Sequence, residues 1–206
     1  MYRLYGSTGS GSASVEAALA ETGAAYEIVP TSTAEGRHLT DAFRKINPRQ
    51  QVPALQLPDG SAMSEGAAMM LHLADAFLDA RLAPAPGSPA RAQHDRWLVF
   101  MAVNLYEGAL REAYAGRYTD DPNGADQVMS NAQAYQKRHF EILEAVIGDG
   151  PFLFGKEMTM ADIYLWMLAN WTDQNWLAAR CPKIMALAAA VRERPRIEPI
   201  HAAHFG

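Results

Sequence analysis

The chain has 206 residues, 49% of them hydrophobic and 20% charged, proportions that are ordinary for a globular protein and exclude a largely disordered one. Its formal net charge of −5 gives no overall attraction to nucleic acid or anionic membranes, and no apolar run approaches the roughly 18 residues that would cross a bilayer. The single cysteine, Cys181, excludes a disulfide framework and a cysteine-rich zinc site, and without a signal-peptide pattern at the N-terminus we expect a soluble cytoplasmic protein.

The first part of the chain alternates between strand and helix patterns. We expect strands over residues 2–5, 26–29, 52–57 and 61–63, and helices over 13–22, 39–46 and 65–80. Gly23 stops the first of these helices, and the second must end before Pro48. A strand, a helix and a strand in immediate succession predict a βαβ unit with parallel strands and a right-handed crossover. The whole order is typical of a thioredoxin-like α/β domain over residues 1–80.

The second part of the chain shows no strand alternation. A proline-rich stretch, residues 81–89, is the expected linker between two domains. Beyond it, apolar residues recur at helical spacing, so we expect an all-helical domain over residues 90–206. Its helices are expected over residues 90–118, 125–147, 159–177 and 183–194. The predicted fold class is therefore α/β plus all-α.

Four stretches of sequence fall at characteristic places in this order of elements. They are Leu19–Gly23 with Tyr26–Glu27, Asn47–Pro48 with Gln51–Leu55, Asp59–Gly60 with Ser64–Ala67 and Ala74–Asp75, and Met158–Tyr164. In this order and at this spacing they make the chain resemble a soluble, cytosolic-type glutathione transferase, closest to the bacterial beta-type and related classes, over essentially its whole length. The resemblance implies glutathione as co-substrate, a small hydrophobic electrophile as second substrate, and a homodimer.

The resemblance also implies where glutathione binds. A cis proline at Pro53 leaves the backbone N–H and C=O of Val52 free, so Val52 can pair with the cysteinyl backbone of glutathione like an added strand. A helix N-terminus at Gly66 suits the γ-glutamyl carboxylate, and Glu65 supplies a counter-charge for the ammonium group. Capping of the helix by Ser64 and Glu65 is the structural alternative. The expected glutathione contacts are Gln51, Val52, Pro53, Ser64, Glu65 and Gly66.

The reaction needs a glutathione thiolate. A free thiol has a pKa of about 8.5, and lowering it by about 2 units needs roughly 2.7 kcal/mol of preferential thiolate stabilisation. The cysteine that beta-type members carry before the first helix falls at Gly11 here. Ser10 is the first choice as hydroxyl donor and Ser12 the second. Tyr5, near the first-strand tyrosine of other classes, is the rival candidate.

The helical domain is expected to supply the electrophile pocket. Tyr106 aligns with a histidine that beta-type members place near the sulfur, and Arg111 and Tyr114 follow on the same helix. Packing of Tyr106 at the domain interface is the alternative. Thr159 and Asp162 form a capping-box pattern that we interpret as structural. The six histidines show no metal-binding spacing.

Two alternatives to conjugation stay open. The same site could serve peroxide reduction, dehalogenation or isomerisation with glutathione. The chain could also be a non-catalytic glutathione-binding or regulatory member of the fold, since the loop cysteine is missing. Val52, Pro53 and Glu65 argue against a pure scaffold.

Overall fold

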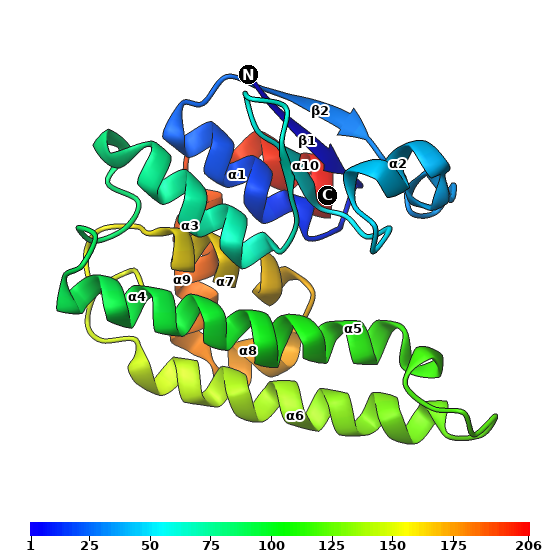
Figure 1. The fold of residues 1–206 in the computed structure, drawn as a ribbon. Coiled ribbons are helices and arrows are strands. Elements are labelled where there is room, and N and C mark those ends of the chain that lie inside the picture. Colours follow the sequence, from blue (N-terminus) through cyan, green and yellow to red (C-terminus); the bar gives the residue numbers. More distant parts are fainter.

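The computed structural model describes residues 1–206, with a small sheet and its helices on one side and a larger set of helices on the other (Figure 1). The sheet has the strand order β2-β1-β3-β4. β1 pairs parallel with β2 and antiparallel with β3, and β3 pairs antiparallel with β4. The strands are β1 (Tyr2–Gly6), β2 (Tyr26–Pro30), β3 (Ala54–Gln56) and β4 (Ala62–Met63). The predicted βαβ unit is confirmed.

The two faces of the sheet carry different helices. Tyr2 of β1 is buried and contacts Phe77 at the end of α3, whereas Tyr5 contacts Phe43 of α2. This alternation follows from the period of two in a strand. α1 ends at Gly23, which has the left-handed φ of 73° that glycine adopts without steric cost. The helices are α1 (Ser12–Thr22), α2 (Asp41–Ile46) and α3 (Gly66–Ala76).

The second part of the chain is entirely helical. Its first helical stretch runs as α4, a π-helical turn at Met101–Tyr106, and α5, and lies beside α6 (Figure 1). The bounds are α4 (Pro89–Phe100), α5 (Glu107–Ala113), α6 (Ala125–Val146), α7 (Met160–Asn170), α8 (Gln174–Arg180), α9 (Pro182–Arg192) and α10 (Glu198–Phe205). The thioredoxin-like part followed by a helical part confirms the predicted fold class.

The helix predictions need correction in four places. The helix expected over 90–118 contains the π-helical turn and ends at Ala113, before a 3₁₀ turn at Ala115–Arg117. The helix expected over 65–80 ends at Ala76 and is followed by a 3₁₀ turn. The helix expected over 159–177 is two helices, because Asp173 accepts hydrogen bonds from the backbone N–H groups of Asn175 and Trp176 and so starts α8. The C-terminal helix α10, which follows Pro195, was not expected at all.

α7 connects the two parts. It packs against α1 and α3 of the sheet domain and against α4 and α9 of the helical domain. One continuous cluster of buried apolar side chains therefore runs from β1 through α7 to α9. The predicted capping box is confirmed: Asp162 is fully buried and accepts hydrogen bonds from the N–H groups of Thr159 and Leu153, each at 2.7 Å.

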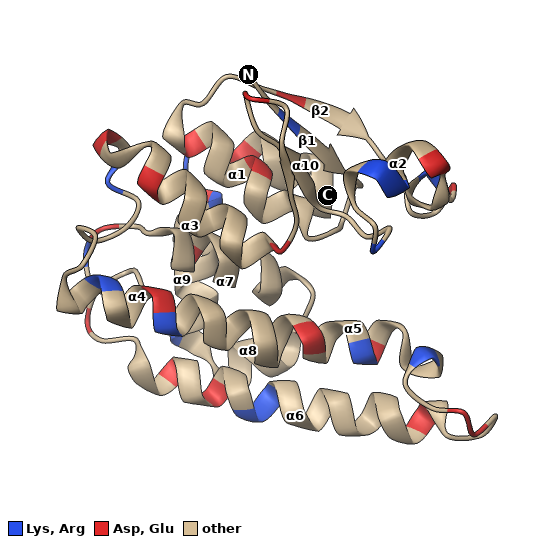
Figure 2. Cartoon of the chain, in the orientation of Figure 1, with Lys and Arg blue, Asp and Glu red and all other residues tan.

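Charged residues are spread over the fold without a single-sign face. Figure 2 shows acidic and basic residues interspersed along the helices and strands of both parts, which agrees with the modest net charge of −5. None of the helices combines the length and apolar character that crossing a membrane requires.

Candidate active site

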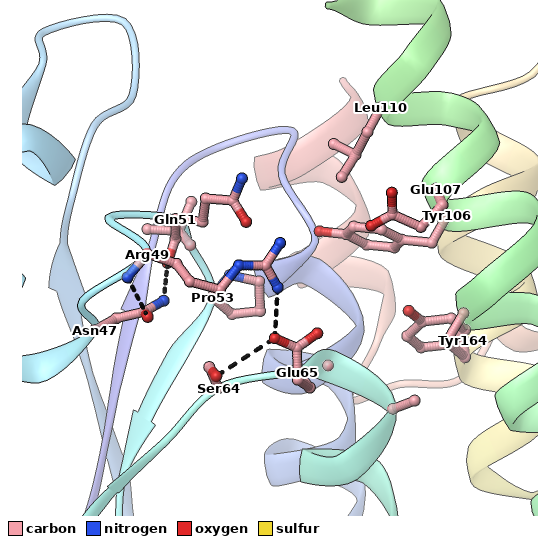
Figure 3. A pocket seen from close by; sticks show the side chains of 14 residues that line it. Asn47, Arg49, Gln51, Pro53, Ser64, Glu65, Tyr106, Glu107, Leu110 and Tyr164 are labelled. Carbon is pink, nitrogen blue, oxygen red and sulfur yellow. Dashed lines mark hydrogen bonds and ion pairs between the residues drawn. The ribbon is translucent and has the colours of Figure 1, made fainter. Parts of the chain in front are cut away.

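A cleft lies between the sheet domain and the helical domain (Figure 3). One wall comes from the segment before β3 and from the start of α3, and the other from the π-helical turn, α5 and α7. All six residues predicted to bind glutathione line this cleft: Gln51, Val52, Pro53, Ser64, Glu65 and Gly66.

The segment before β3 presents a free backbone edge. The Val52–Pro53 peptide is cis, as expected. Neither the N–H nor the C=O of Val52 takes part in a backbone hydrogen bond. Asn47 holds the segment in shape, since its amide donates to the carbonyl of Gln51 at 2.7 Å and its side-chain oxygen accepts from the N–H of Arg49 at 3.1 Å. An extended peptide can therefore pair with Val52 without displacing an existing bond.

The N-terminus of α3 opens into the same cleft. Gly66 is the first residue of the helix, and no side chain caps it. The first N–H groups of a helix lack partners within it and carry a partial positive charge, so this end suits an anionic group. Capping by Ser64 and Glu65, the structural alternative, is wrong. Glu65 precedes the helix with φ of 68°, a conformation that side-chain-bearing residues rarely adopt and that is concentrated at functional sites.

Glu65 also forms an ion pair across the mouth of the cleft. Its Oε1 lies 2.7 Å from Nη1 of Arg49. Both side chains are exposed, so the pair adds little to stability. The second carboxylate oxygen of Glu65 has no partner. Arg49 was not among the predicted residues, although it directly follows the Asn47–Pro48 motif.

Aromatic residues form the opposite wall. Tyr106 stacks on Tyr164 with 6.2 Å between ring centroids and meets the edge of Trp171 at 5.4 Å. Burial, and then the nearby carboxylates of Glu65 and Glu107, raise the pKa of Tyr106 to about 12. Tyr106 is therefore a neutral phenol at physiological pH, able to donate a hydrogen bond but not to act as a base.

The structure does not bring the other two predicted pocket residues to the cleft. Leu110, one turn after Tyr106, lines the cleft. Arg111, the next residue, is rotated by about 100° around the helix axis and does not line it. The Arg111 guanidinium lies 5.7 Å from the ring centroid of Tyr118, in a separate cavity of about 370 Å³ between α5 and α6. Tyr114 is 42% exposed and lies beneath the guanidinium of Arg117.

The three hydroxyl groups predicted to contact the thiolate are also outside the cleft lining. Ser10 donates to the carbonyl of Ser7 at 2.7 Å and shares a hydrogen bond with Ser12 at 2.9 Å. Ser12 is buried and also bonds to Ser7. Tyr5 packs on Phe43 on the face of the sheet that α2 covers. These positions do not support the role expected for the three hydroxyl groups, because Ser10 and Ser12 already bond to Ser7 and the ring of Tyr5 packs against α2.

The loop before α1 nevertheless meets the aromatic wall. A Cβ atom at Gly11 would lie only 2.4 Å from the hydroxyl oxygen of Tyr106. The peptide of Gly9 is held from both sides: its C=O accepts from Nε1 of Trp171 at 3.0 Å, and its N–H donates to Nδ1 of His204 at 3.2 Å. The helical domain thus fixes this loop.

Comparison with known proteins places the chain in a family. Residues 12–76 match the model of the glutathione S-transferase N-terminal domain, and residues 110–200 match that of the glutathione S-transferase C-terminal domain. Neither range includes Gly11 or Tyr106.

Individual relatives support the same assignment. The chain is 29% identical over 202 residues to the glutathione S-transferase-like protein YncG of Escherichia coli K12, covering 97% of both chains. It is 30% identical to mouse maleylacetoacetate isomerase over 73% of this chain and 68% of the relative. A sphingomonad glutathione S-transferase solved in complex with glutathione is 28% identical, with a TM-score of 0.82 over 98% of both chains.

Proposed function

The chain belongs to the glutathione S-transferase family, and we propose that its cleft binds glutathione and presents the thiolate to a small hydrophobic electrophile. The observation that carries the proposal is the unpaired backbone of Val52 beside the uncapped N-terminus of α3 and the carboxylate of Glu65. These three features match the middle and one end of glutathione, a peptide with an α-carboxylate and an ammonium group on its γ-glutamyl residue.

The middle of glutathione pairs with Val52. The N–H and C=O of Val52 form two hydrogen bonds with the backbone of the cysteinyl residue, in the manner of an added antiparallel strand. This pairing fixes the direction of the peptide along the cleft and leaves the cysteinyl side chain free to approach the helical wall.

The γ-glutamyl end binds at the start of α3. Its carboxylate accepts hydrogen bonds from the first N–H groups of the helix, beginning at Gly66, with the hydroxyl of Ser64 nearby. Its ammonium group meets the unpartnered oxygen of Glu65, while Arg49 keeps the carboxylate in place through the other oxygen.

The electrophile occupies the helical wall. Ala102 and Leu110 give this wall an apolar surface, and Glu107 adds a negative charge. The one cation of the cleft, Arg49, is engaged by Glu65. A neutral electrophile fits these surroundings better than a dicarboxylate, which favours conjugation over isomerisation of an acidic substrate such as maleylacetoacetate, named for the mouse relative.

Calorimetric titration with glutathione tests the proposal. Replacing Glu65→Gln removes the counter-charge of the ammonium group, and a lost charge-assisted hydrogen bond of about 1.5–3 kcal/mol lowers the affinity on the order of tenfold to a hundredfold. Glu157→Gln, at an exposed position outside the cleft, is the matched control and should bind normally. Absence of binding by the unmodified protein would contradict the proposal. Thiol consumption with an aryl halide, compared with isomerisation of maleylacetoacetate, then identifies the reaction.

We also propose that the protein forms a homodimer, as the family resemblance implies. Val99 and Val103 lie one helical turn apart and are 49% and 55% exposed, so they form a small apolar surface that a second copy of the chain could cover. Light scattering should give a mass about twice that of the 22.5 kDa chain. Val103→Asp should lower that mass to the monomer's, because it puts a charge into the apolar contact.

A further inference from the structure

Building on the proposed glutathione binding, we infer that the hydroxyl of Tyr106 donates the hydrogen bond that stabilises the glutathione thiolate. Gly11 is the residue that makes room for it. A side chain from the helical domain thus takes the place that a side chain of the loop before α1 would otherwise hold. The family matches cover neither position.

The phenol of Tyr106 fits against Gly11. Gly11 is the residue directly before α1. A Cβ atom there would lie 2.4 Å from the hydroxyl oxygen of Tyr106 and 3.0 and 3.1 Å from two of its ring carbons. No real side chain tolerates such distances, so the tip of the phenol fills the space of a residue-11 side chain. It therefore lies at the N-terminus of α1, whose partial positive charge also favours a thiolate.

The hydroxyl of Tyr106 is fixed in position but makes no hydrogen bond within the protein. The ring of Tyr106 is held between Tyr164 and Trp171. Its hydroxyl makes no hydrogen bond to a protein group, unlike that of Tyr135 on α6, which donates to Asn104. Figure 3 shows the Tyr106 hydroxyl directed across the cleft toward the wall that carries Gln51 and Pro53. A fixed donor that needs no rearrangement is the arrangement that stabilises a developing or resident anion most effectively.

The neighbouring hydroxyl groups either have hydrogen-bond partners already or lie at another part of the cleft. Ser10 and Ser12 bond to each other and to Ser7. The hydroxyl of Tyr164 lies 3.8 Å from the Cβ position of Gly66, at the glutamyl end of the cleft. Among these groups, only the hydroxyl of Tyr106 lies at the N-terminus of α1 without a hydrogen bond to another protein group.

The proposed step is a nucleophilic substitution at the electrophile. The glutathione thiol gives its proton to bulk water, and the resulting thiolate accepts a hydrogen bond from the Tyr106 O–H. The sulfur lone pair forms the new S–C bond to the electrophile, and the leaving group departs with the electron pair of the broken bond. Because burial keeps the pKa of Tyr106 at about 12, the phenol retains its proton throughout and acts only as a hydrogen-bond donor.

The test follows the thiolate directly. The ultraviolet absorbance of enzyme-bound glutathione, titrated with pH, gives the pKa of its thiol. Tyr106→Phe should raise this pKa by about 1–2 units, because it deletes one hydrogen bond to a charged acceptor. The pH profile of kcat/KM should move in the same direction. Tyr118→Phe, at an exposed tyrosine outside the cleft, should change neither quantity.

A rescue variant separates chemistry from packing. Tyr106→Ala should raise the thiol pKa as well, and it empties the space beside Gly11. Adding Gly11→Ser to Tyr106→Ala puts a hydroxyl back at the same place from the loop side, so the thiol pKa should fall again. Gly11→Ala alone should raise it, since the new methyl group displaces the phenol without supplying a hydroxyl.

Each result decides the inference. If glutathione binds to Tyr106→Phe with an unchanged thiol pKa, the inference is wrong while the proposed function stands. If Ser10→Ala raises the pKa and Tyr106→Phe does not, the loop supplies the donor. If calorimetry shows no binding to the unmodified protein, both the proposed function and the inference fail.

Discussion

Two residues beside the cleft, Gln50 and Glu65, have backbone angles that favour glycine, with φ of 53° and 68°. For a residue with a side chain, this region costs about 1–2 kcal/mol. At Glu65 this conformation accompanies a side chain that lines the cleft. The side chain of Gln50 makes only one long hydrogen bond, to the carbonyl of His38 at 3.4 Å, so its left-handed conformation supports no comparable contact.

Replacing Gln50→Gly should therefore stabilise the protein. Relief of the left-handed conformation outweighs the extra chain entropy of glycine, about 0.5–1 kcal/mol, so we expect the free energy of unfolding to rise by about 0.5–1 kcal/mol. Urea denaturation measures the change. Ala134→Gly, at an exposed position inside α6, controls for the entropy of glycine and should lose about 1 kcal/mol. A loss of stability in both variants would contradict this reasoning.

Asp162 should make stability depend on pH. Burial raises its pKa to about 6, and the hydrogen bonds from Leu153 and Thr159 only partly oppose this. The unfolded chain releases this proton near pH 4, so between the two pKa values the folded state holds a proton that the unfolded state has lost. The stabilisation that this raised pKa gives the folded state is then fully present below about pH 4. It is lost as the pH rises through about 6, which lowers the free energy of unfolding by up to roughly 3 kcal/mol.

Asp162→Asn tests this dependence. The variant should be less stable at every pH, because an amide cannot accept all the hydrogen bonds that the carboxylate accepts. It should also lose less stability than the unmodified protein between about pH 4 and pH 7. Denaturant titrations at several pH values give both results, and parallel pH curves for the two proteins would be the contrary outcome.

At the scale of single elements, local signals identified most of the fold. Gly23 and Pro48 ended helices where the sequence predicted, because they act on their own backbone. The division between α7 and α8 escaped prediction, since an aspartate inside an apolar helical pattern gives no sign that it will cap a new helix. α10 escaped because it is short and its burial depends on contacts of His201 and Phe205 with Trp166 of α7.

The candidate site also contains some residues that local sequence signals identify and others that they do not. The six residues predicted to contact glutathione lie in two short segments whose local geometry carries them together, so sequence motifs could group them in one cleft. The proposed thiolate donor and the proposed electrophile pocket depend on side-chain direction across two domains. The π-helical turn at Met101–Tyr106 sets the phase of the residues that follow it, so Arg111 and Tyr114 turned away from the cleft without any local signal.

The C-terminal helix α10 braces the loop before α1. His204 of α10 accepts a hydrogen bond from the N–H of Gly9 and contacts Glu16 of α1 at 3.0 Å through its other ring nitrogen. His204→Ala removes both contacts. Hydrogen exchange at the amides of residues 9–12 should therefore become faster, as measured by mass spectrometry. His139→Ala, on α6, should leave this exchange unchanged, and equal rates in all three proteins would show that the brace is unimportant.

At the scale of the whole molecule, the two structural parts share one core. α7 lies against helices of both parts, and a charged cluster adds a second link. Arg91 of α4 is only 8% exposed and forms two hydrogen bonds to Asp75 at the end of α3, at 2.7 and 3.2 Å, and one to Asp95. The cleft depends on both parts, so a rigid connection between them keeps its two walls in register.

We therefore expect the chain to unfold in one cooperative transition. All its tryptophans lie in the helical part. Their fluorescence should change together with the circular dichroism of the whole molecule. Asp75→Asn weakens the link but leaves Arg91 its bond to Asp95. Because Asp75 is half-exposed, the expected loss is moderate, about 1–2 kcal/mol. Asp79→Asn, on the 3₁₀ turn after α3 and without an ion pair, is the matched control and should stay within about 0.5 kcal/mol of the unmodified protein. If the two signals separated in the unmodified protein, the sheet and helical parts would be independent folding units, and the shared core would not hold the cleft together.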